Sequence, residues 1–323
     1  MGVPGYAHPL LAAAEWTALT RPGTPLDWVV LTVANGPGDR PDPDCLAAAG
    51  RLVNAGVRVL GQLDLAHGAR PVGELAADAE RYALWYRVGG FLLDRCPSDR
   101  AGLAAVRRTT AVLRAVAGTV GCVTGTRIGT GSGTSTGTGA GIGSGDTGGT
   151  AAGGPARSGV GRSGVARSGA VRLVLGHGTQ PYPGYAEIAD QLVTFCGSWA
   201  DYRWSQVAEW TADHPPGRFA HFVHGVPRTH LEEAVRIARW QGAGTVFFTD
   251  RRADRPAGPP SGTGPDTGTG LGSGPVPLSA DGPVADQAGG TEYAPAIGHS
   301  RAFESLPGYW DDFVSQIGPG VSE

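Results

Sequence analysis

The sequence predicts an α/β fold, a (β/α)8 barrel of the TIM type. Short apolar runs alternate with amphipathic stretches along the chain, which is typical of parallel strands separated by helices. Eight such runs are present, the number of strands in this barrel. Two low-complexity segments interrupt the pattern, and setting them aside leaves about 226 of the 323 residues. A compact barrel needs ~200–250 residues.

The eight runs are predicted as strands because they are short, continuous and rich in Val, Leu and Phe, as in strands buried on both faces. They cover residues 3–7, 28–33, 57–63, 90–93, 171–175, 192–195, 219–223 and 245–249.

Five amphipathic stretches separate most of these runs and are predicted as helices, because their apolar residues recur every three or four positions. They cover residues 11–19, 44–55, 73–86, 102–117 and 229–241. We expect the last helix to begin with a capping box formed by Thr229 and Glu232.

The two low-complexity segments are predicted to be long, disordered Gly-rich loop insertions. Residues 118–170 contain GTGSGTSTGTGAGIGSGDTGG, and residues 253–296 contain PAGPPSGTGPDTGTGLGSGPVP. Such compositions bury too little apolar surface to offset the entropy lost on ordering. Neither flank looks able to fold alone, so we expect one barrel domain over residues 1–323, interrupted by both segments.

Composition excludes several classes of function. All 26 basic residues are arginine, so no lysine is present for a Schiff base, a pyridoxal phosphate anchor or a P-loop. A formal net charge of −3 gives no indication of a nucleic-acid partner. We expect no cofactor and no metal, because the histidines do not show a recognised metal-binding spacing. The cysteines are interpreted as reduced thiols; they are Cys45, Cys96, Cys122 and Cys196.

No apolar run approaches the ~20 residues of a membrane span, and the first residues do not resemble a signal peptide. We therefore expect a cytoplasmic protein without membrane contact, or a secreted one if the start codon is misassigned. The oligomeric state stays open.

A barrel of this type carries its chemistry at the C-terminal ends of its strands. Polar or aromatic side chains follow every predicted strand, in segments that lie far apart in the chain. They are Tyr6 and His8, Asn35, Asp64 and His67, Asp94 to Cys96, His177, Cys196 and Trp199, His224, and Asp250.

Seven segments resemble the spherulation-specific family 4 (spherulin-4-like) proteins. In chain order they are VPGYAHP, VVLTVANGPGDRPDP, GVRVLGQLDLAHGARP, GGFLLDRCPS, GYAEIADQLVTFCGSW, RFAHFVHGVP and ESLPGYWDDFV. The likeness covers nearly all of the chain outside the low-complexity segments. It implies a (β/α)8 barrel related to fungal glycoside hydrolases that cut galactosamine-containing polysaccharide, and hence a polysaccharide or oligosaccharide as partner.

The resemblance also implies three acids in the hydrolytic members. These are an Asp-Glu pair at the end of the fourth strand and a Glu within Phe-Glu-Gly at the end of the sixth. Asp94 keeps the first acid, but Arg95 and Cys196 stand at the other two positions. Where relatives often show Asn-Pro-Gly after the fifth strand, this chain has Gly176, His177 and Gly178.

Glycoside hydrolysis usually needs two carboxyl groups, ~5–5.5 Å or ~6.5–9.5 Å apart. Arg95 cannot donate a proton at neutral pH because its pKa lies above ~12, and a thiol is a poor general acid. The predicted catalytic residues are therefore Asp94 and Asp64, which would follow neighbouring strands; Asp250 is an alternative partner. Substrate-assisted hydrolysis, in which an N-acetyl group of the sugar is the nucleophile, is another route.

The remaining rim residues are predicted to bind substrate, although loop packing would explain several of them equally well. Trp199, Tyr202 and Trp204 could also stack on sugar rings. The predicted substrate-binding residues are Tyr6, Asn35, His67, Arg95, His177, Trp199, His224 and Asp250.

Three functions stay open. The first is a glycoside-hydrolase-like enzyme that depends on Asp94. The second is a pseudoenzyme that binds glycan or protein without cutting, because two of three expected acids are replaced. The third is a thiol enzyme built on Cys196 with a histidine such as His177, against which stands the interpretation of Cys196 as an inert buried thiol.

Overall fold

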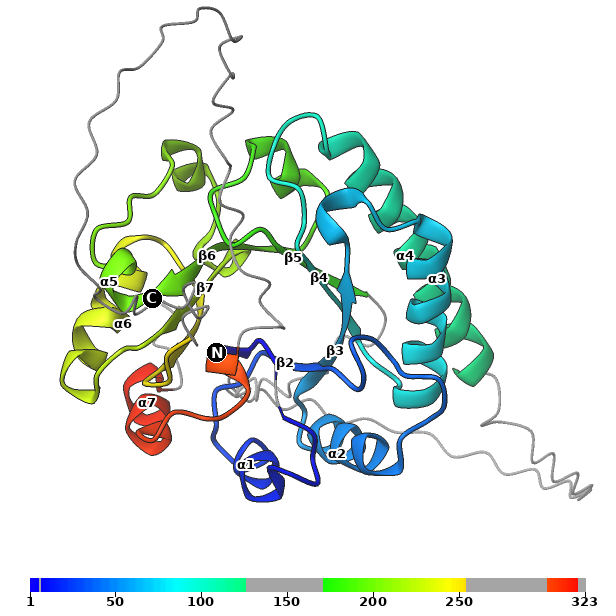
Figure 1. Cartoon of the computed structure of the whole chain (residues 1–323), viewed down its shortest axis with the longest axis horizontal. Coiled ribbons are helices and arrows are strands. Elements are labelled where there is room, and N and C mark those ends of the chain that lie inside the picture. The colour runs from blue at the N-terminus through cyan, green and yellow to red at the C-terminus, as the bar shows by residue number, and fades with distance from the viewer. Residues whose placement is uncertain (6, 126–170, 254–300, 319–323) are drawn as a thin grey trace, which may run out of the picture.

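Eight parallel strands form one sheet that rolls into a nearly closed barrel, with helices on its outside (Figure 1). The computed structural model describes residues 1–5, 7–125, 171–253 and 301–318. Each strand pairs with the next along the chain, from β1–β2 to β7–β8, and β8 lies beside β1. The strands are β1 (Gly2–Val3), β2 (Trp28–Leu31), β3 (Arg58–Asp64), β4 (Gly90–Asp94), β5 (Arg172–Gly176), β6 (Gln191–Ser198), β7 (Phe219–His224) and β8 (Thr245–Thr249).

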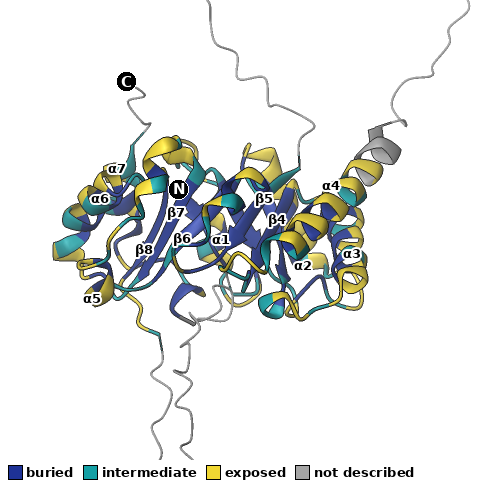
Figure 2. Cartoon of the chain, turned by 90° about the horizontal axis from the view of Figure 1, so that it is seen from above, coloured by how far each residue is buried: buried dark blue, intermediate teal, exposed yellow. Residues whose placement is uncertain are grey.

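The helices pack around this sheet and expose their outer faces, whereas the strands are buried (Figure 2). A π-helical turn (Tyr82–Tyr86) extends α3, and short 3-10 segments fill several other connections. None of the helices in the described ranges combines the length with the apolar character that a membrane span needs. The α-helices are α1 (Ala13–Ala18), α2 (Pro43–Asn54), α3 (Val72–Arg81), α4 (Leu103–Gly125), α5 (Trp199–Tyr202), α6 (Leu231–Trp240) and α7 (Trp310–Ile317).

The predicted barrel is confirmed, and the predicted strands and helices differ from the observed ones mainly at their ends. β1 stops at Val3, because Pro4 has no N–H to donate to a strand ladder. α4 continues to Gly125, into residues assigned to the first insertion. The other insertion residues, apart from Ala253, lie outside those that the structure describes.

The predicted capping box of α6 is wrong. Thr229 lies inside a 3-10 turn (Arg228–His230) that precedes α6, and His230 occupies the N-cap position. Because Thr229 lies one residue before the N-cap, inside the 3-10 turn, its hydroxyl is not placed to accept from the free backbone N–H groups in the first turn of α6. His230 Nδ1 instead lies 2.8 Å from Oε2 of Glu233.

Polar contacts inside the barrel tie distant strands together. Trp28 is fully buried and donates from Nε1 to Oε1 of Gln191 at 2.9 Å. Gln191 in turn donates from Nε2 to Oγ1 of Thr245 at 2.9 Å. Because all three groups are buried and hydrogen-bonded, they join β2, β6 and β8 without leaving an unsatisfied polar atom among them.

The C-terminal segment completes the wall between β8 and β1. The N–H of Ala7 donates to the carbonyl of Glu304 at 3.1 Å, and the N–H of Leu306 donates to Oε2 of Glu15 at 2.9 Å. Phe303 is buried against Phe222 and Phe247. The chain end therefore forms part of the barrel, with α7 lying next to α6 (Figure 1); periodicity alone did not predict this helix.

Gly61 on β3 gives a test of the packing between sheet and helices. A Cβ at this position would lie 2.7 Å from Cγ of Tyr82, so we expect Gly61→Ala to lower the free energy of unfolding by about 1–3 kcal/mol through overpacking. The matched control is Gly50→Ala on α2, where nothing lies within 4 Å of a new Cβ. That variant should gain about 0.5–1 kcal/mol. Urea denaturation measures both, and equal stability of Gly61→Ala and wild type would contradict the packing.

Candidate functional site

The ends of β3 and β4 bring the two predicted catalytic acids side by side. Asp64 and Asp94 are direct partners in the parallel register. Side chains alternate between the two faces of a strand, and Gly61 faces Tyr82 on the helix side. Gln62 and Asp64 therefore face the barrel interior, as Asp94 does. The sequence prediction that these acids meet at the rim agrees with this placement.

Asp94 is held by hydrogen bonds to both carboxylate oxygens. Its exposed fraction is 1%. Oδ2 accepts from Nε2 of Gln62 at 3.0 Å, and Oδ1 accepts from the N–H of Arg95 at 2.9 Å. Gln62 Oε1 accepts from the hydroxyl of Thr32. The hydrogen-bonded chain Thr32–Gln62–Asp94 thus runs from the residue after β2 across β3 to the end of β4 and positions the carboxylate.

Arg95 binds Asp64 through two parallel hydrogen bonds. Nε donates to Oδ1 at 2.8 Å, and Nη2 donates to Oδ2. The N–H of Ala66 also donates to Oδ1 of Asp64 at 2.8 Å. These hydrogen bonds from its own side chain to Asp64 raise the pKa of Arg95 against the opposing effect of burial. A bidentate pair of this kind stabilises the charged forms of both partners, so Asp64 is poorly suited to donate a proton.

The backbone around this ion pair adopts an unusual conformation. Arg95 has φ +48°, and Ala66 and His67 in the loop after β3 have φ +46° and +55°. Left-handed backbone costs a non-glycine residue roughly 1–2 kcal/mol. Two hydrogen bonds between the loops offset this cost, from Leu65 N–H to the carbonyl of Asp94 and from His67 N–H to the carbonyl of Arg95, at 2.9 and 2.8 Å.

A bulge in β6 turns Cys196 toward the barrel interior. The register with β7 shifts between Val193 and Phe195, so that Cys196 pairs with Phe222, whose ring packs on Phe303 and Trp28 inside the barrel. Burial and the negative charge of Asp94 raise the pKa of the Cys196 thiol. A raised pKa disfavours the thiolate that nucleophilic catalysis requires, which speaks against the thiol-enzyme hypothesis.

His177 and Trp199 are buried, with exposed fractions of 6% and 7%. The His177 ring packs edge-on against Tyr185, with centroids 4.7 Å apart. Among the described residues, no group lies at hydrogen-bonding distance and angle to either ring nitrogen of His177. Burial lowers the pKa of His177 to about 4, and the carbonyls of Cys96 and Pro97 oppose this shift.

Trp199 packs against Tyr202 and His230.

Tyr202 is a core residue and not a stacking platform for sugar. It is fully buried, and its hydroxyl lies 2.8 Å from Nδ1 of His221. Trp204 by contrast is 80% exposed, with the Arg203 guanidinium 5.9 Å above its ring.

The other predicted ligand residues are distributed around the rim. Asn35 is exposed, and His67 is half-buried. His224 packs on Phe303, and burial lowers its pKa. Asp250 is exposed and accepts from the N–H of Gly308 at 3.2 Å, so the structure links it to the C-terminal segment. Tyr6 lies outside the described residues.

The structure thus brings together Asp64, Arg95 and Asp94 and, from β6 two strands further along the sheet, Cys196. Sequence reasoning missed Gln62 and Thr32, which position Asp94. A detectable signal was the polar Gln62 inside an otherwise apolar strand, because a buried polar side chain needs a specific partner.

Comparison with known proteins places this geometry in context. The model of spherulation-specific family 4 matches residues 1–258. Among solved structures, the crystal structure of Aspergillus clavatus Sph3 in complex with GalNAc superposes with a TM-score of 0.59 at 18% sequence identity. The superposition covers 98% of this chain and 96% of that chain, and at this identity it shows the shared fold alone. No curated protein matches the sequence.

Buried His221 on β7 predicts a specific pH dependence of stability. Burial lowers its pKa to about 3, whereas an imidazole in the unfolded chain titrates near 6.5. Between these pH values the unfolded chain binds the proton and the native state does not. Stability should therefore fall by about 1.4 kcal/mol per pH unit as the pH drops from 6.5 toward 3.

Urea denaturation at pH 7, 6, 5 and 4 measures this contribution. His221→Gln should remove that part of the slope. The control Thr194→Val removes only the 3.1 Å contact to His221 Nε2 and should retain the slope. Identical slopes for His221→Gln and wild type would show that His221 does not titrate in this way.

Proposed function

Because the chain belongs to spherulation-specific family 4, we propose that it is a carbohydrate-binding barrel that has lost two-carboxylate glycoside hydrolysis. The observation that carries this proposal is the bidentate ion pair between Arg95 and Asp64. It occupies the carboxylate that stands next to Asp94 and would otherwise be its nearest catalytic partner.

The residues at positions 95 and 196 also support the loss of two-carboxylate hydrolysis. Where the resemblance implies a second and a third acid, the chain has a permanently charged guanidinium at Arg95 and a buried thiol at Cys196. Neither group can act as a general acid or general base near neutral pH. Asp94 itself is almost completely buried, so its carboxylate is not presented to a ligand in this conformation.

The solved structure of the same fold in complex with GalNAc supports a sugar as the ligand. We take N-acetylgalactosamine and galactosamine oligosaccharides as the first ligands to test. Arg95 is suited to contact a sugar because its side chain stays 34% exposed while it binds Asp64. A guanidinium has five N–H donors, and Asp64 accepts from two of them.

Hydrolysis through Asp94 is the second candidate. The hydrogen bonds from Gln62 to Asp94 and from Thr32 to Gln62 support this candidate, because they fix the orientation of the Asp94 carboxylate at the end of β4. A substrate that carries an N-acetyl group could supply the nucleophile, so that one enzyme carboxyl group would suffice.

Calorimetric titration with galactosamine and N-acetylgalactosamine oligosaccharides tests binding. We expect saturable binding without release of reducing ends. Arg95→Ala should weaken it about 10-fold or more, because a hydrogen bond from a charged donor is worth about 1.5–3 kcal/mol. The control is Arg236→Ala, an exposed arginine on the outer helix α6, which should bind as wild type does. Absence of binding, or equal affinity of Arg95→Ala and wild type, would contradict the proposal.

Replacement of the missing acids tests the loss of hydrolysis. We expect the double variant Arg95→Glu/Cys196→Glu to release reducing ends from an oligosaccharide that the wild type leaves intact, since it adds two carboxyl groups and frees Asp64. The isosteric control Arg95→Gln/Cys196→Gln should stay inactive, and circular dichroism verifies that both variants fold. Turnover by the wild-type chain that Asp94→Asn abolishes would instead establish the second candidate.

A further inference from the structure

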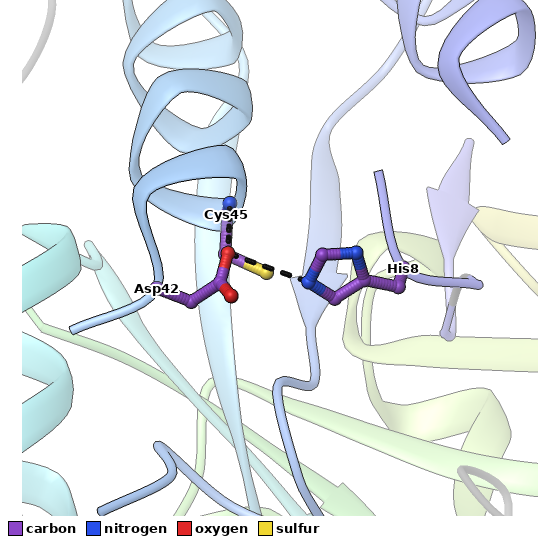
Figure 3. A group of neighbouring side chains, drawn as sticks. All are labelled: His8, Asp42 and Cys45. Atoms are coloured by element: carbon purple, nitrogen blue, oxygen red, sulfur yellow. Dashed lines mark hydrogen bonds and ion pairs between the residues drawn. The ribbon is translucent and has the colours of Figure 1, made fainter. Parts of the chain in front are cut away.

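Three potential metal ligands of different chemistry converge between the segment after β1 and the start of α2 (Figure 3). They are His8, Asp42 and Cys45. One ligand atom from each lies within 4.8 Å of the other two. His8 Nε2 and Asp42 Oδ1 are 3.3 Å apart. The sulfur of Cys45 lies on the same side, facing the imidazole (Figure 3).

The local sequence explains how Asp42 and Cys45 come together. Asp42 is the N-cap of α2, and its Oδ1 accepts from the N–H of Cys45 at 2.8 Å. Pro43 at the first helical position favours this start. The backbone N–H of Asp42 is fixed by the hydroxyl of Tyr86, at 2.9 Å. Two of the three side chains are therefore held in place before any ligand binds.

The third side chain comes from a distant part of the chain and is accessible. His8 has a side-chain exposure of 27% and Asp42 of 29%, whereas Cys45 is fully buried. An ion could therefore enter from the solvent side, between His8 and Asp42, and meet the sulfur behind them.

We propose that His8, Asp42 and Cys45 bind one divalent transition-metal ion of the Zn²⁺ class. Imidazole nitrogen, thiolate sulfur and carboxylate oxygen are the usual zinc ligands, at about 2.0–2.3 Å from the metal. Magnesium and calcium prefer sets made of oxygen alone, which disfavours both ions here. A water molecule completes four-coordination.

Negative charge near the three ligand atoms favours a cation. Asp42 is the N-cap of α2 and Asp44 lies in its first turn, so two carboxylates stand at the same helix start as the Cys45 thiol.

Binding releases one proton to solvent and moves a second one within the His8 ring, from Nε2 to Nδ1. The thiol proton of Cys45 leaves to solvent, as expected for a metal-bound cysteine. The ring proton of His8 must reside on Nδ1, so that the lone pair of Nε2 faces the metal. Leu10 N–H now donates to Nδ1 at 3.3 Å, and this long contact is exchanged for one with water.

The site is separate from the proposed sugar site. Its ligands come from the segment after β1 and from the N-terminus of α2 and include none of the residues of the Asp64–Arg95–Asp94 group. Both segments lie at the C-terminal rim of the barrel, after β1 and after β2. An ion would join them to each other, so its expected effect is on stability.

Cobalt and zinc titrations of the chelator-treated full-length chain test the proposal. We expect one Co²⁺ per chain with a thiolate-to-cobalt charge-transfer band in the near ultraviolet, and loss of that band on adding one equivalent of Zn²⁺. Zinc should also raise the melting temperature of the wild type, because a ligand that binds the native state stabilises it.

Three variants identify the ligands. His8→Ala and Cys45→Ser should each weaken zinc binding by more than about 100-fold, since loss of even an outer-shell partner costs 10–100-fold. Asp42→Asn keeps an N-cap acceptor but removes the carboxylate, so it should fold and still bind zinc more weakly. The controls Cys96→Ala and His214→Ala should bind as wild type does.

Two results would overturn the proposal. One is the absence of a cobalt–thiolate band in the wild-type chain. The other is a band that persists in both His8→Ala and Cys45→Ser. Because His8 is partly exposed, the His8→Ala variant should remain folded and keep the test decisive. The outcome does not depend on sugar binding.

Discussion

The ion pair between Arg95 and Asp64 determines what the rim of this barrel can do chemically. The parallel register of β3 and β4 aligns Asp64 with Asp94, an arrangement that could serve two-carboxylate chemistry. Arg95, one residue beyond Asp94, turns back and engages both oxygens of Asp64. Removal of either partner of such a pair would leave a partly buried charge without compensation, which is costly. The pair therefore stabilises the rim and occupies a carboxylate that hydrolysis would need.

Contacts inside the barrel fix the orientation of the side chains at this rim. Side chains that alternate along β2, β3 and β4 place Thr32, Gln62 and Asp94 in one hydrogen-bonded chain. On the opposite wall, a single extra residue in β6 changes which side chains face inward, so that Cys196 occupies the interior while Phe195 packs on Tyr202. A bulge is a common means of redirecting a side chain near a site. The position at which the family resemblance implies an acid is thus directed inward here but holds a thiol.

Much of the fold was predictable because it depends on local patterns. Strands buried on both faces leave continuous apolar runs, and all eight predicted strands are present at the expected places in the chain. The placement of Asp64 beside Asp94 followed from the order of the strands. The C-terminal helix α7 was not predicted. It packs on α6 and, through Phe313, on Phe247 and Phe248 of β8, and no local pattern describes these contacts.

The sequence by itself determined the class of fold and the family resemblance, and it showed that Arg95 and Cys196 stand where that resemblance implies acids. Only the tertiary structure decided that Arg95 binds Asp64, that His177 and Tyr202 are buried, and that His8 approaches Asp42 and Cys45. The physical reason is that secondary structure follows from periodicities of a few residues. Side-chain partners separated by 31 or more positions depend on register, bulges and loop paths, which are set when the whole ring of strands packs together.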